Sequence, residues 1–338
     1  GSGKSFVCRQ MLDQWASLPG NFAAGRRLVH ANRLLDQLCN AKTVRNDDGS
    51  RISKVIHVHF DRASGHLVGA KFVTTQLDQA RLLAPPASDR NYHIFYQLCF
   101  GAGDTERAWL GIGSVRTYRL LNQSSCFQAG VRDENDHIVT GDLMQKAGLR
   151  LAETQNIYTI VAAVLHLGNV EFAVDEDGET TAHSTPQGEA AVLDAARVLG
   201  IGASSLAAAL CSRQLSTRRS AKAVAYSVNL PREKAEVGRD TLVQSMYAVL
   251  VEWLTSRLSR GLHTARSAED IAQSTLSIVD FPGFESLERN GFHQLLSNYG
   301  FERLATLYAQ TEAFSLLAAY DSEGLRRPPG WAEAEGGF

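Results

Sequence analysis

The stretch that decides the fold is Gly1-Ser2-Gly3-Lys4-Ser5, which runs directly into the helical spacing of Phe6–Ser17. Glycines let backbone N–H groups turn toward phosphate oxygens, and the positive end of the following helix adds to the attraction. In such a loop Lys4 would neutralise the β- and γ-phosphates, and the Ser5 hydroxyl would be a Mg²⁺ ligand. The stretch predicts the second half of a Walker A loop, with all five residues binding nucleotide. A flexible terminus or a cloning remnant has the same letters, so the rest of the chain has to decide.

Strands and helices alternate along the remaining sequence. Val55–Phe60 and Leu67–Val73 form a predicted hairpin around Ser64-Gly65, and Thr275–Val279 is a short apolar strand. Val170–Val174 is a further predicted strand, and Arg213–Asn229 is predicted to be irregular and polar. Helices are predicted at Thr75–Leu83, Tyr92–Phe100, Leu143–Leu151, Ile157–Leu167, Gly188–Leu199, Ser204–Leu210, Pro231–Leu262 and Phe292–Tyr320. Strands separated by this much helix predict an α/β fold of the P-loop NTPase type, a mixed sheet with a large helical insertion.

Composition narrows the class of protein. The chain has 338 residues, 44% of them hydrophobic, and a net charge of −2, so no global field attracts nucleic acid or an anionic membrane. Its five cysteines are scattered without a CxxC pair, which argues against a disulfide framework or a zinc site and fits a reducing compartment. The longest apolar stretch, Ile157–Leu167, is too short to span a bilayer. We therefore expect a cytoplasmic protein without a membrane span.

Two further segments bear on phosphate chemistry. Arg45–Lys54 reads Arg-Asn-Asp-Asp-Gly-Ser-Arg-Ile-Ser-Lys, and Asp280–Glu285 reads Asp-Phe-Pro-Gly-Phe-Glu. Together with the Lys4 loop they resemble switch I (N-x-N-S-S-R-F-G-K) and switch II (D-I-x-G-F-E) of myosin motor domains. Further blocks similar to that family follow in the same order: Asn40–Asn46, Tyr92–Leu98, Leu165–Val170 and Phe292–Tyr299.

The resemblance implies a nucleotide site that holds ATP and Mg²⁺. Asn46 would contact phosphate, Ser50 would be the second hydroxyl ligand of Mg²⁺, and Asp280 would hold a Mg²⁺-bound water. The Gly283 N–H would touch the γ-phosphate. Arg51 and Glu285 would form a salt bridge that positions the attacking water. Two unrelated surface charges are the plainer interpretation of that last pair.

The resemblance also implies a partner, filamentous actin, and a cytoskeletal location. By position, Arg213, Arg218 and Arg219 fall in an actin-facing loop, although an ordinary solvated loop explains them equally well. It implies a partial motor domain over 1–325, followed by an irregular tail at 326–338. The front of the phosphate loop, and any light-chain or cargo region, would then lie outside this sequence.

The chain departs from the family pattern at several positions. Asp48 replaces Asn, Gly49 replaces Ser, and Phe281-Pro282 replaces Ile-x. A carboxylate about 5 Å from a phosphate charge is repelled by roughly 3 kcal/mol at an effective dielectric of about 20, so Asp48 matters if it points inward and not if it faces solvent. These departures favour an alternative, a motor-like actin tether or scaffold that does not hydrolyse ATP. An unrelated P-loop kinase or ATPase is a third hypothesis.

Two other clusters have plain structural interpretations. His57 and His59 share one strand face, and without a third ligand at fixed spacing we expect packed or edge histidines rather than metal ligands. Asp133-Glu134-Asn135-Asp136 lacks the ligand spacing of a calcium loop, so we expect it to open a helix.

Overall fold

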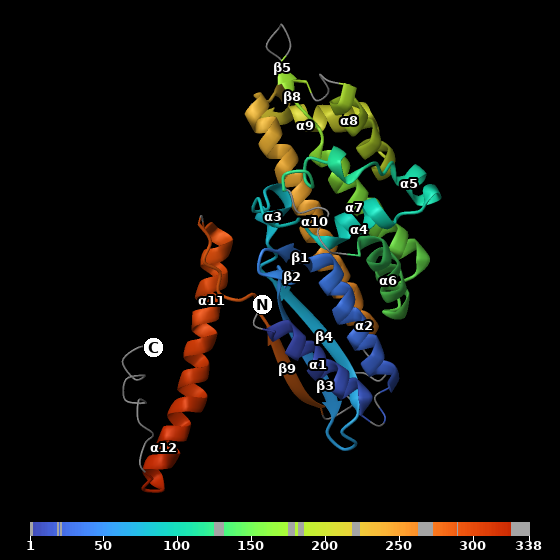
Figure 1. Cartoon of the computed structure of the whole chain (residues 1–338). Coiled ribbons are helices and arrows are strands. Elements are labelled where there is room, and N and C mark those ends of the chain that lie inside the picture. The colour runs from blue at the N-terminus through green and yellow to red at the C-terminus, as the bar shows by residue number, and fades with distance from the viewer. Residues whose placement is uncertain are drawn as a thin grey trace. The chain divides into compact units, whose positions relative to one another are not determined.

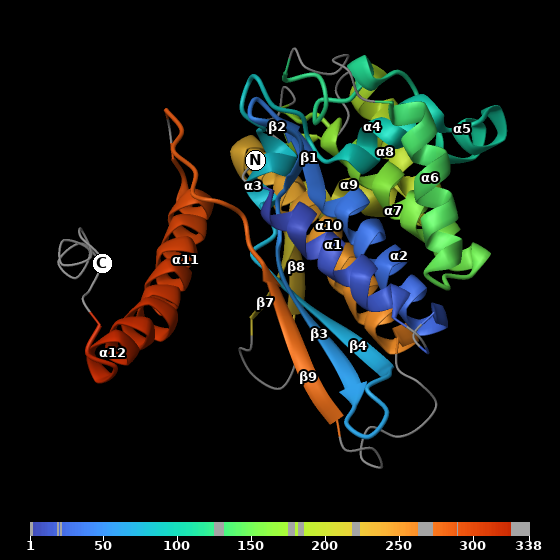
Figure 2. The same cartoon turned by 60° about the horizontal axis from the view of Figure 1, so that its bottom comes forward.

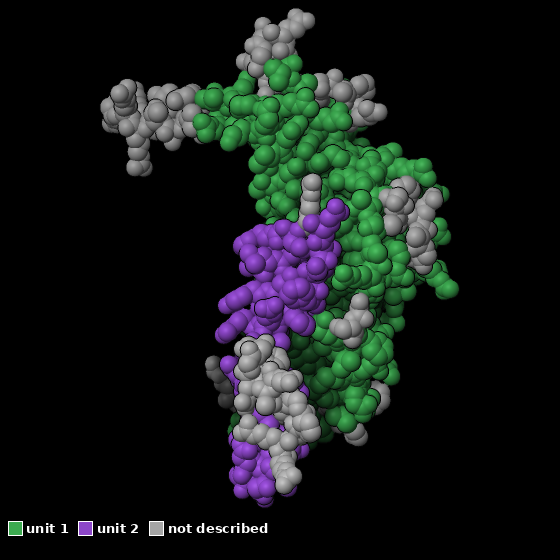
Figure 3. Space-filling model, turned by 60° about the vertical axis from the view of Figure 1, so that its left-hand side comes forward, with its two compact units in different colours: residues 1, 3–280 green, residues 2, 281–338 purple. Residues whose placement is uncertain are grey.

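The computed structural model describes residues 3–18, 20, 22–124, 132–174, 180–181, 186–217, 224–262, 273–288 and 290–325. The chain divides into two compact units, one ending at Asp280 and the other beginning at Phe281 (Figure 3). The predicted alternation of strands and helices is found in the first unit, whereas the described elements of the second unit are helical. Each unit is described by itself below.

The first unit is built on a three-stranded sheet with the order β4-β3-β9. β3 (Ser53–Asp61) is antiparallel to β4 (Leu67–Thr75) and to β9 (Gln273–Asp280), which confirms the predicted hairpin and the predicted third strand. The register pairs Lys54 with Asp280. Because side chains alternate between faces, Lys54, Ile56 and Val58 share the buried face. All strand pairs among the described residues are antiparallel, so the parallel part of the expected mixed sheet is not seen there.

Three helices lie against this sheet, α1 (Lys4–Ser17), α2 (Phe22–Cys39) and α10 (Arg232–Leu262) (Figures 1 and 2). α10 runs along β4, where the Ser259 Oγ accepts a hydrogen bond of 3.0 Å from the Phe72 N–H. A buried sheet edge needs partners for its backbone groups, and α10 supplies one. Pro231 directly precedes α10, as the sequence predicts for the start of that helix.

The helical insertion gathers beyond one end of the sheet (Figure 1) and shares one hydrophobic core with it. In α7 (Leu151–Gly168), Ile157, Val161, Val164 and Leu165 are all fully buried. The expected core helix is therefore confirmed. No single helix among the described residues is long and apolar enough to cross a membrane. One bent pair of helices, Gly188–Leu199 with Ala203–Cys211, reaches the required length and apolar composition, and these are the only grounds on which it qualifies. The insertion comprises α3 (Gln79–Leu83), α4 (His93–Gly101), α5 (Asp104–Leu110), a 3₁₀ turn at Val115–Thr117, α6 (Asp133–Lys146), α7 (Leu151–Gly168), α8 (Pro186–Leu199) and α9 (Ala203–Cys211).

The helix predicted over Leu143–Leu151 is wrong, because the chain breaks there between α6 and α7. Gly148 adopts a φ of 87°, and a Cβ atom at this position would lie 1.9 Å from the Arg27 Nη2. The Arg27 Nε also donates to the Ala147 carbonyl at 3.2 Å. A long-range contact with α2 thus fixes a turn that the apolar spacing concealed.

Several other boundaries differ from the predictions. Arg213–Asn229 is not irregular at its ends, because β7 (Ser212–Thr217) pairs antiparallel with β8 (Val224–Asn229). The strand expected at Val170–Val174 is reduced to β5 (Ala173–Val174), which pairs with β6 (Thr180–Thr181). The helix expected from Thr75 begins only at Gln79, since β4 runs on to Thr75. α2, β1 (Asn40–Thr43) and β2 (Asn46–Ser50) were not predicted.

The second unit contains the helix predicted over Phe292–Tyr320, in three parts. α11 (Phe292–Tyr308) continues through a π-helical turn (Ala309–Ala313) into α12 (Phe314–Ser322). Before α11, the Phe281 ring packs on Gly300, where a Cβ atom would lie 2.3 Å from the Phe281 Cζ. The bulky ring that replaces the family's isoleucine therefore fits because residue 300 has no side chain.

Candidate functional site

The beginning of α1 contacts the end of β9. Gly3 precedes the helix with a φ of 78°, a conformation that glycine adopts without strain. One residue into the helix, the Ser5 Oγ donates a hydrogen bond of 2.8 Å to the Asp280 Oδ1. The two residues are 275 positions apart in sequence. The fold therefore brings the hydroxyl of the predicted phosphate loop to the carboxylate of the predicted switch II.

A buried cluster of charges lies behind this contact. The Lys54 Nζ is 2.5 Å from the Asp36 Oδ1 of α2 and 3.5 Å from the Asp280 Oδ2. Burial alone would lower the pKa of Lys54, but the Asp36 and Asp280 carboxylates outweigh it and raise that pKa. Lys54 stays cationic, and it fixes both carboxylates.

The donor set at this point suits a hydrated magnesium ion. The Asp280 Oδ2 is buried and has no hydrogen-bond partner among the described residues. The other oxygen of this carboxylate, Oδ1, accepts the hydrogen bond from the Ser5 hydroxyl. Magnesium prefers oxygen ligands and keeps several waters when it binds together with substrate phosphates. No group of three or more His, Cys, Asp or Glu in the described part of the chain could hold a metal by itself. Ser5 and Asp280 therefore fit an ion that arrives with phosphate.

Residues Asn46–Ser50 of the predicted switch I segment form strand β2. β2 pairs antiparallel with β1, with Gly49 opposite Ala41. The Asn46 side chain bonds within the strand, accepting from the Asp48 N–H at 3.1 Å and donating to the Asp48 carbonyl at 3.2 Å. The Ser50 Oγ donates to the Ile52 carbonyl at 3.1 Å. To bind phosphate or Mg²⁺, both side chains would have to exchange these local bonds.

Gly49 and Arg51 are constrained by the same hairpin. Arg51 is buried, its N–H donates to the Cys39 carbonyl at 3.0 Å, and its carbonyl accepts from the Asp78 N–H at 2.9 Å. A Cβ atom on Gly49 would lie 3.3 Å from the Ala41 carbonyl oxygen and 3.5 Å from the Arg51 Nη2. A serine, the family residue, would fit only if these neighbours shifted slightly, so glycine at 49 has a local packing reason.

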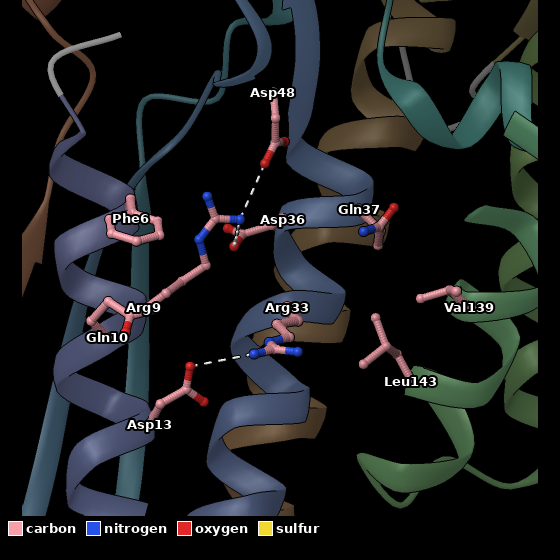
Figure 4. Close-up of a pocket in the computed structure, with 10 residues that line it drawn as sticks. All are labelled: Phe6, Arg9, Gln10, Asp13, Arg33, Asp36, Gln37, Asp48, Val139 and Leu143. Atoms are coloured by element: carbon pink, nitrogen blue, oxygen red, sulfur yellow. Dashed lines mark hydrogen bonds and ion pairs between the residues drawn. The ribbon is translucent and has the colours of Figure 1, made fainter. Parts of the chain in front are cut away.

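Asp48 carries an extra negative charge that the structure balances. Its Oδ2 accepts from the Arg9 Nη1 at 3.1 Å (Figure 4). Its Oδ1 accepts from the Asn40 Nδ2 at 2.6 Å. The Asp48 side chain is 46% exposed, so it neither points fully inward nor lies fully in solvent. The sequence analysis missed Arg9, Asn40 and Asp36 altogether. A helical spacing of four between Ser5 and Arg9 was the one signal that could have placed Arg9 on the same face of α1.

Gly283 and Glu285 belong to the second unit. Asn298 of α11 holds the Glu285 backbone, because its Oδ1 accepts from the Glu285 N–H at 2.8 Å and its Nδ2 donates to the Glu285 carbonyl at 2.7 Å. The Gln294 Nε2 donates to the Glu285 Oε2 at 3.3 Å. The salt bridge between Arg51 and Glu285 would join the two units, so it remains a prediction.

The remaining site predictions are distributed as follows. Lys4 is exposed at the first position of α1, and Arg213 is exposed on β7. Gly1 and Ser2 of the phosphate loop, Arg218 and Arg219 of the actin-facing loop, and the tail at 326–338 lie outside the described residues.

The histidines and acidic cluster have the plain roles that the sequence predicts. The His57 Nδ1 lies 2.8 Å from the Ser277 Oγ, and the His59 Nδ1 lies 3.0 Å from the Thr275 Oγ1, so both are cross-strand partners of β9. Asp133 begins α6.

The cysteines that the structure describes are buried free thiols: Cys8, Cys39, Cys99 and Cys211. Burial raises the pKa of Cys8 to about 11 and that of Cys39 to about 12. The absence of disulfides among these four agrees with the sequence analysis, and their thiols are poor nucleophiles at neutral pH.

Comparison of the sequence with known proteins identifies the family of this chain. The profile of the myosin head (motor domain) matches residues 3–327. The chain is 33% identical over 298 residues to the myosin-J heavy chain of Dictyostelium discoideum, covering 86% of this chain and 13% of that protein. It is 32% identical to myosin-3 of Arabidopsis thaliana, covering 90% of this chain and 26% of the relative, and 29% identical to myosin heavy chain IB of Acanthamoeba castellanii, covering 97% and 28%.

The chain therefore spans a minor part of the length of these relatives, roughly an eighth to a quarter or slightly more. The match nevertheless runs almost from end to end of this chain, and the ordered blocks in the sequence and the contact between α1 and β9 agree with it. The chain belongs to the myosin head (motor domain) family.

Proposed function

We propose that this chain is the nucleotide-binding core of an actin-based cytoskeletal motor of the P-loop NTPase type, in which hydrolysis of Mg²⁺–ATP is coupled to actin binding in the cytoplasm. The observation that carries the proposal is the 2.8 Å hydrogen bond from the Ser5 Oγ to the Asp280 Oδ1. It supports a shared Mg²⁺ site, because a hydroxyl from the phosphate loop and a carboxylate at the end of the adjacent strand are the two protein groups that such a site needs.

In this proposal, bound Mg²⁺ supplies charge neutralisation at the phosphates. Lys4 faces the β- and γ-phosphates from the N-terminus of α1, where the helix dipole is also positive. Lys54 holds the Asp280 carboxylate at 3.5 Å and keeps it oriented toward Ser5. Gly283 donates its N–H to the γ-phosphate, and Glu285 with Arg51 excludes bulk water and orients the attacking water molecule.

The alternative, an actin tether that does not hydrolyse ATP, keeps part of its support. Gly49 lacks the hydroxyl of the family motif, and Pro282 restricts the backbone at the start of the second unit. Asp48 no longer favours the alternative, because Arg9 balances its charge and Asn40 donates a hydrogen bond to it. One experiment separates the two functions.

That experiment measures release of inorganic phosphate from Mg²⁺–ATP by the protein that carries this chain, with and without filamentous actin. The matched variant is Glu285→Ala, which removes the predicted gate and leaves Ser5, Lys54 and Asp280 intact. We expect actin to accelerate phosphate release and the variant to abolish that acceleration. Binding of actin that is independent of ATP, with no phosphate release, would overturn the motor proposal in favour of the tether.

A further inference from the structure

A cleft of about 350 Å³ lies between α1, α2 and α6 of the first unit (Figure 4). Two ion pairs bridge its walls. The Arg9 Nη1 of α1 meets the Asp48 Oδ2 of β2 at 3.1 Å, and the Arg33 Nη2 of α2 meets the Asp13 Oδ2 of α1 at 3.3 Å. Both pairs join α1 to a neighbouring element, and both are partly exposed.

The Arg9 pair is tied into the buried cluster, whereas the Arg33 pair forms no ion pair with that cluster among the described residues. The Arg9 Nη1 also lies 3.9 Å from the Asp36 Oδ2, an oxygen with no hydrogen-bond partner among the described residues. Asp36 is in turn paired with Lys54. Arg9 is only 29% exposed, and the neighbouring carboxylates raise its pKa although burial alone would lower it. Its charge is therefore held at a fixed place in the cleft.

The position of Arg9 decides where the Asp48 carboxylate lies. Arg9 follows Ser5 by four residues, so the two side chains share a face of α1, and Arg9 is about 6 Å farther along the axis from the N-terminus. Ser5 holds Asp280 at the first turn, and Arg9 holds Asp48 beside the next. An ion pair at this second position draws the extra carboxylate away from the end of the helix where phosphates would bind.

We infer that Arg9 is a positioning residue for nucleotide binding, which neutralises Asp48 and keeps its carboxylate away from the phosphates. The inference rests on the proposed function, since it concerns the same nucleotide site. It explains how the chain tolerates an aspartate where the family motif has asparagine. Without Arg9, Asp48 would keep the hydrogen bond from the neutral Asn40 amide but lose its countercharge, and it would repel the nucleotide.

The test is a double-mutant cycle read by the dissociation constant of Mg²⁺–ATP, measured calorimetrically on the protein that carries this chain. The variants are Arg9→Met, Asp48→Asn and the two combined, with Arg9→Lys as the conservative change. Arg33→Met is the matched control, because it breaks an ion pair in the same cleft that joins the same helix α1 but does not involve Asp48. Hydrogen exchange of the amides of β2 in the nucleotide-free protein provides a second readout.

We expect Arg9→Met to weaken Mg²⁺–ATP binding about tenfold or more, by charge repulsion over a short distance. Arg9→Lys should retain most of the affinity, and the combined variant should recover most of what Arg9→Met loses. Arg9→Met should also speed exchange in β2, because the strand loses its tie to α1. Arg33→Met should change neither readout.

Three results would contradict the inference, and they are distinguishable. Nucleotide binding by the unaltered protein that Arg9→Met leaves unchanged would overturn the inference alone. If Arg9→Met and the combined variant lose the same affinity for Mg²⁺–ATP, Arg9 acts only by supporting α1. This result excludes the inference even where Arg9→Met is partly unfolded, because removing the Asp48 charge restores nothing. No binding of Mg²⁺–ATP by the unaltered protein would overturn the proposed function together with the inference.

Discussion

Two groups of ion pairs of the first unit, an inner cluster and the pairs of the cleft, differ in burial. In the inner cluster, Lys54 holds Asp36 and Asp280 with side chains that are at most 6% exposed. In the cleft, the pairs of Arg9 with Asp48 and of Arg33 with Asp13 have partners that are 29–50% exposed. A buried charge cannot lose its partner without a large penalty, whereas a solvated charge can. The inner cluster is therefore a fixed part of the fold, and the ion pairs of the cleft contribute less to its stability.

The largest effect should come from breaking the inner cluster. Lys54→Met would leave Asp36 and Asp280 buried without their shared cation, and we expect the free energy of unfolding to fall by about 3–5 kcal/mol. Urea denaturation measures this change. Lys71→Met, an exposed lysine on β4, is the matched control and should cost less than about 0.5 kcal/mol. A loss below about 1 kcal/mol for Lys54→Met would show that water reaches the cluster.

A half-buried pair should give an intermediate effect. Glu153, in the first turn of α7, accepts from the Arg257 Nε at 2.7 Å and from the Arg150 N–H at 2.8 Å. Glu153→Gln should lower the free energy of unfolding by roughly 1.5–3 kcal/mol at pH 7, because hydrogen bonds to a charged group are lost. Glu236→Gln, which breaks the exposed pair with Arg232, is the control and should cost less than about 0.5 kcal/mol.

The same Glu153 pair should be visible in acid. The hydrogen bond from Arg257 lowers the pKa of Glu153 from 4.5 to about 2. The stabilisation is thus complete above pH 4.5 and is lost as the pH falls toward 2. The difference in stability between the native protein and Glu153→Gln should therefore shrink over that interval. A difference that stays constant down to pH 2 would contradict the assignment.

His93 is a buried histidine near the Asp48 carboxylate of the cleft, and its protonation should affect stability. Burial, with Arg90 nearby, lowers the pKa of His93 from 6.5 to about 4, although the Asp48 Oδ1 lies 3.9 Å from its Nε2. The unfolded chain binds this proton at higher pH than the folded chain, so stability falls as the pH drops from 6.5 toward 4. The contribution lost at pH 5 is about 2 kcal/mol. His93→Leu should flatten the stability profile in this interval, and an unchanged slope would refute the assignment.

The smallest effect should come from the outermost pair. Arg33→Met should change the free energy of unfolding by less than about 1 kcal/mol, and the change should disappear in 1 M salt, because both partners are well exposed. Thermal unfolding at low and high salt measures it. A larger change, insensitive to salt, would mean that the cleft is closed to solvent and would remove the distinction between the two groups of pairs.

Local patterns predicted those elements that apolar periodicity, turn residues or a helix-starting proline mark in the sequence. The helix after Lys4, the hairpin of β3 and β4, and the start of α10 after Pro231 all follow from periodicity and turn residues. The break at Gly148 did not, because Arg27 of α2 determines it across more than a hundred residues. The pairing of β7 with β8, from Ser212 with Asn229 to Thr217 with Val224, was not predicted either.

The sequence by itself determined the phosphate-loop letters, the aspartate that ends β9 and the family to which both belong, because these depend on residue type and order. Only the tertiary structure decided that Arg9 balances Asp48 and that Lys54 ties Asp36 to Asp280. Those contacts join residues 39, 18 and 226 positions apart. No local periodicity encodes such distances, because the packing of α1 and α2 on the sheet sets which charges meet.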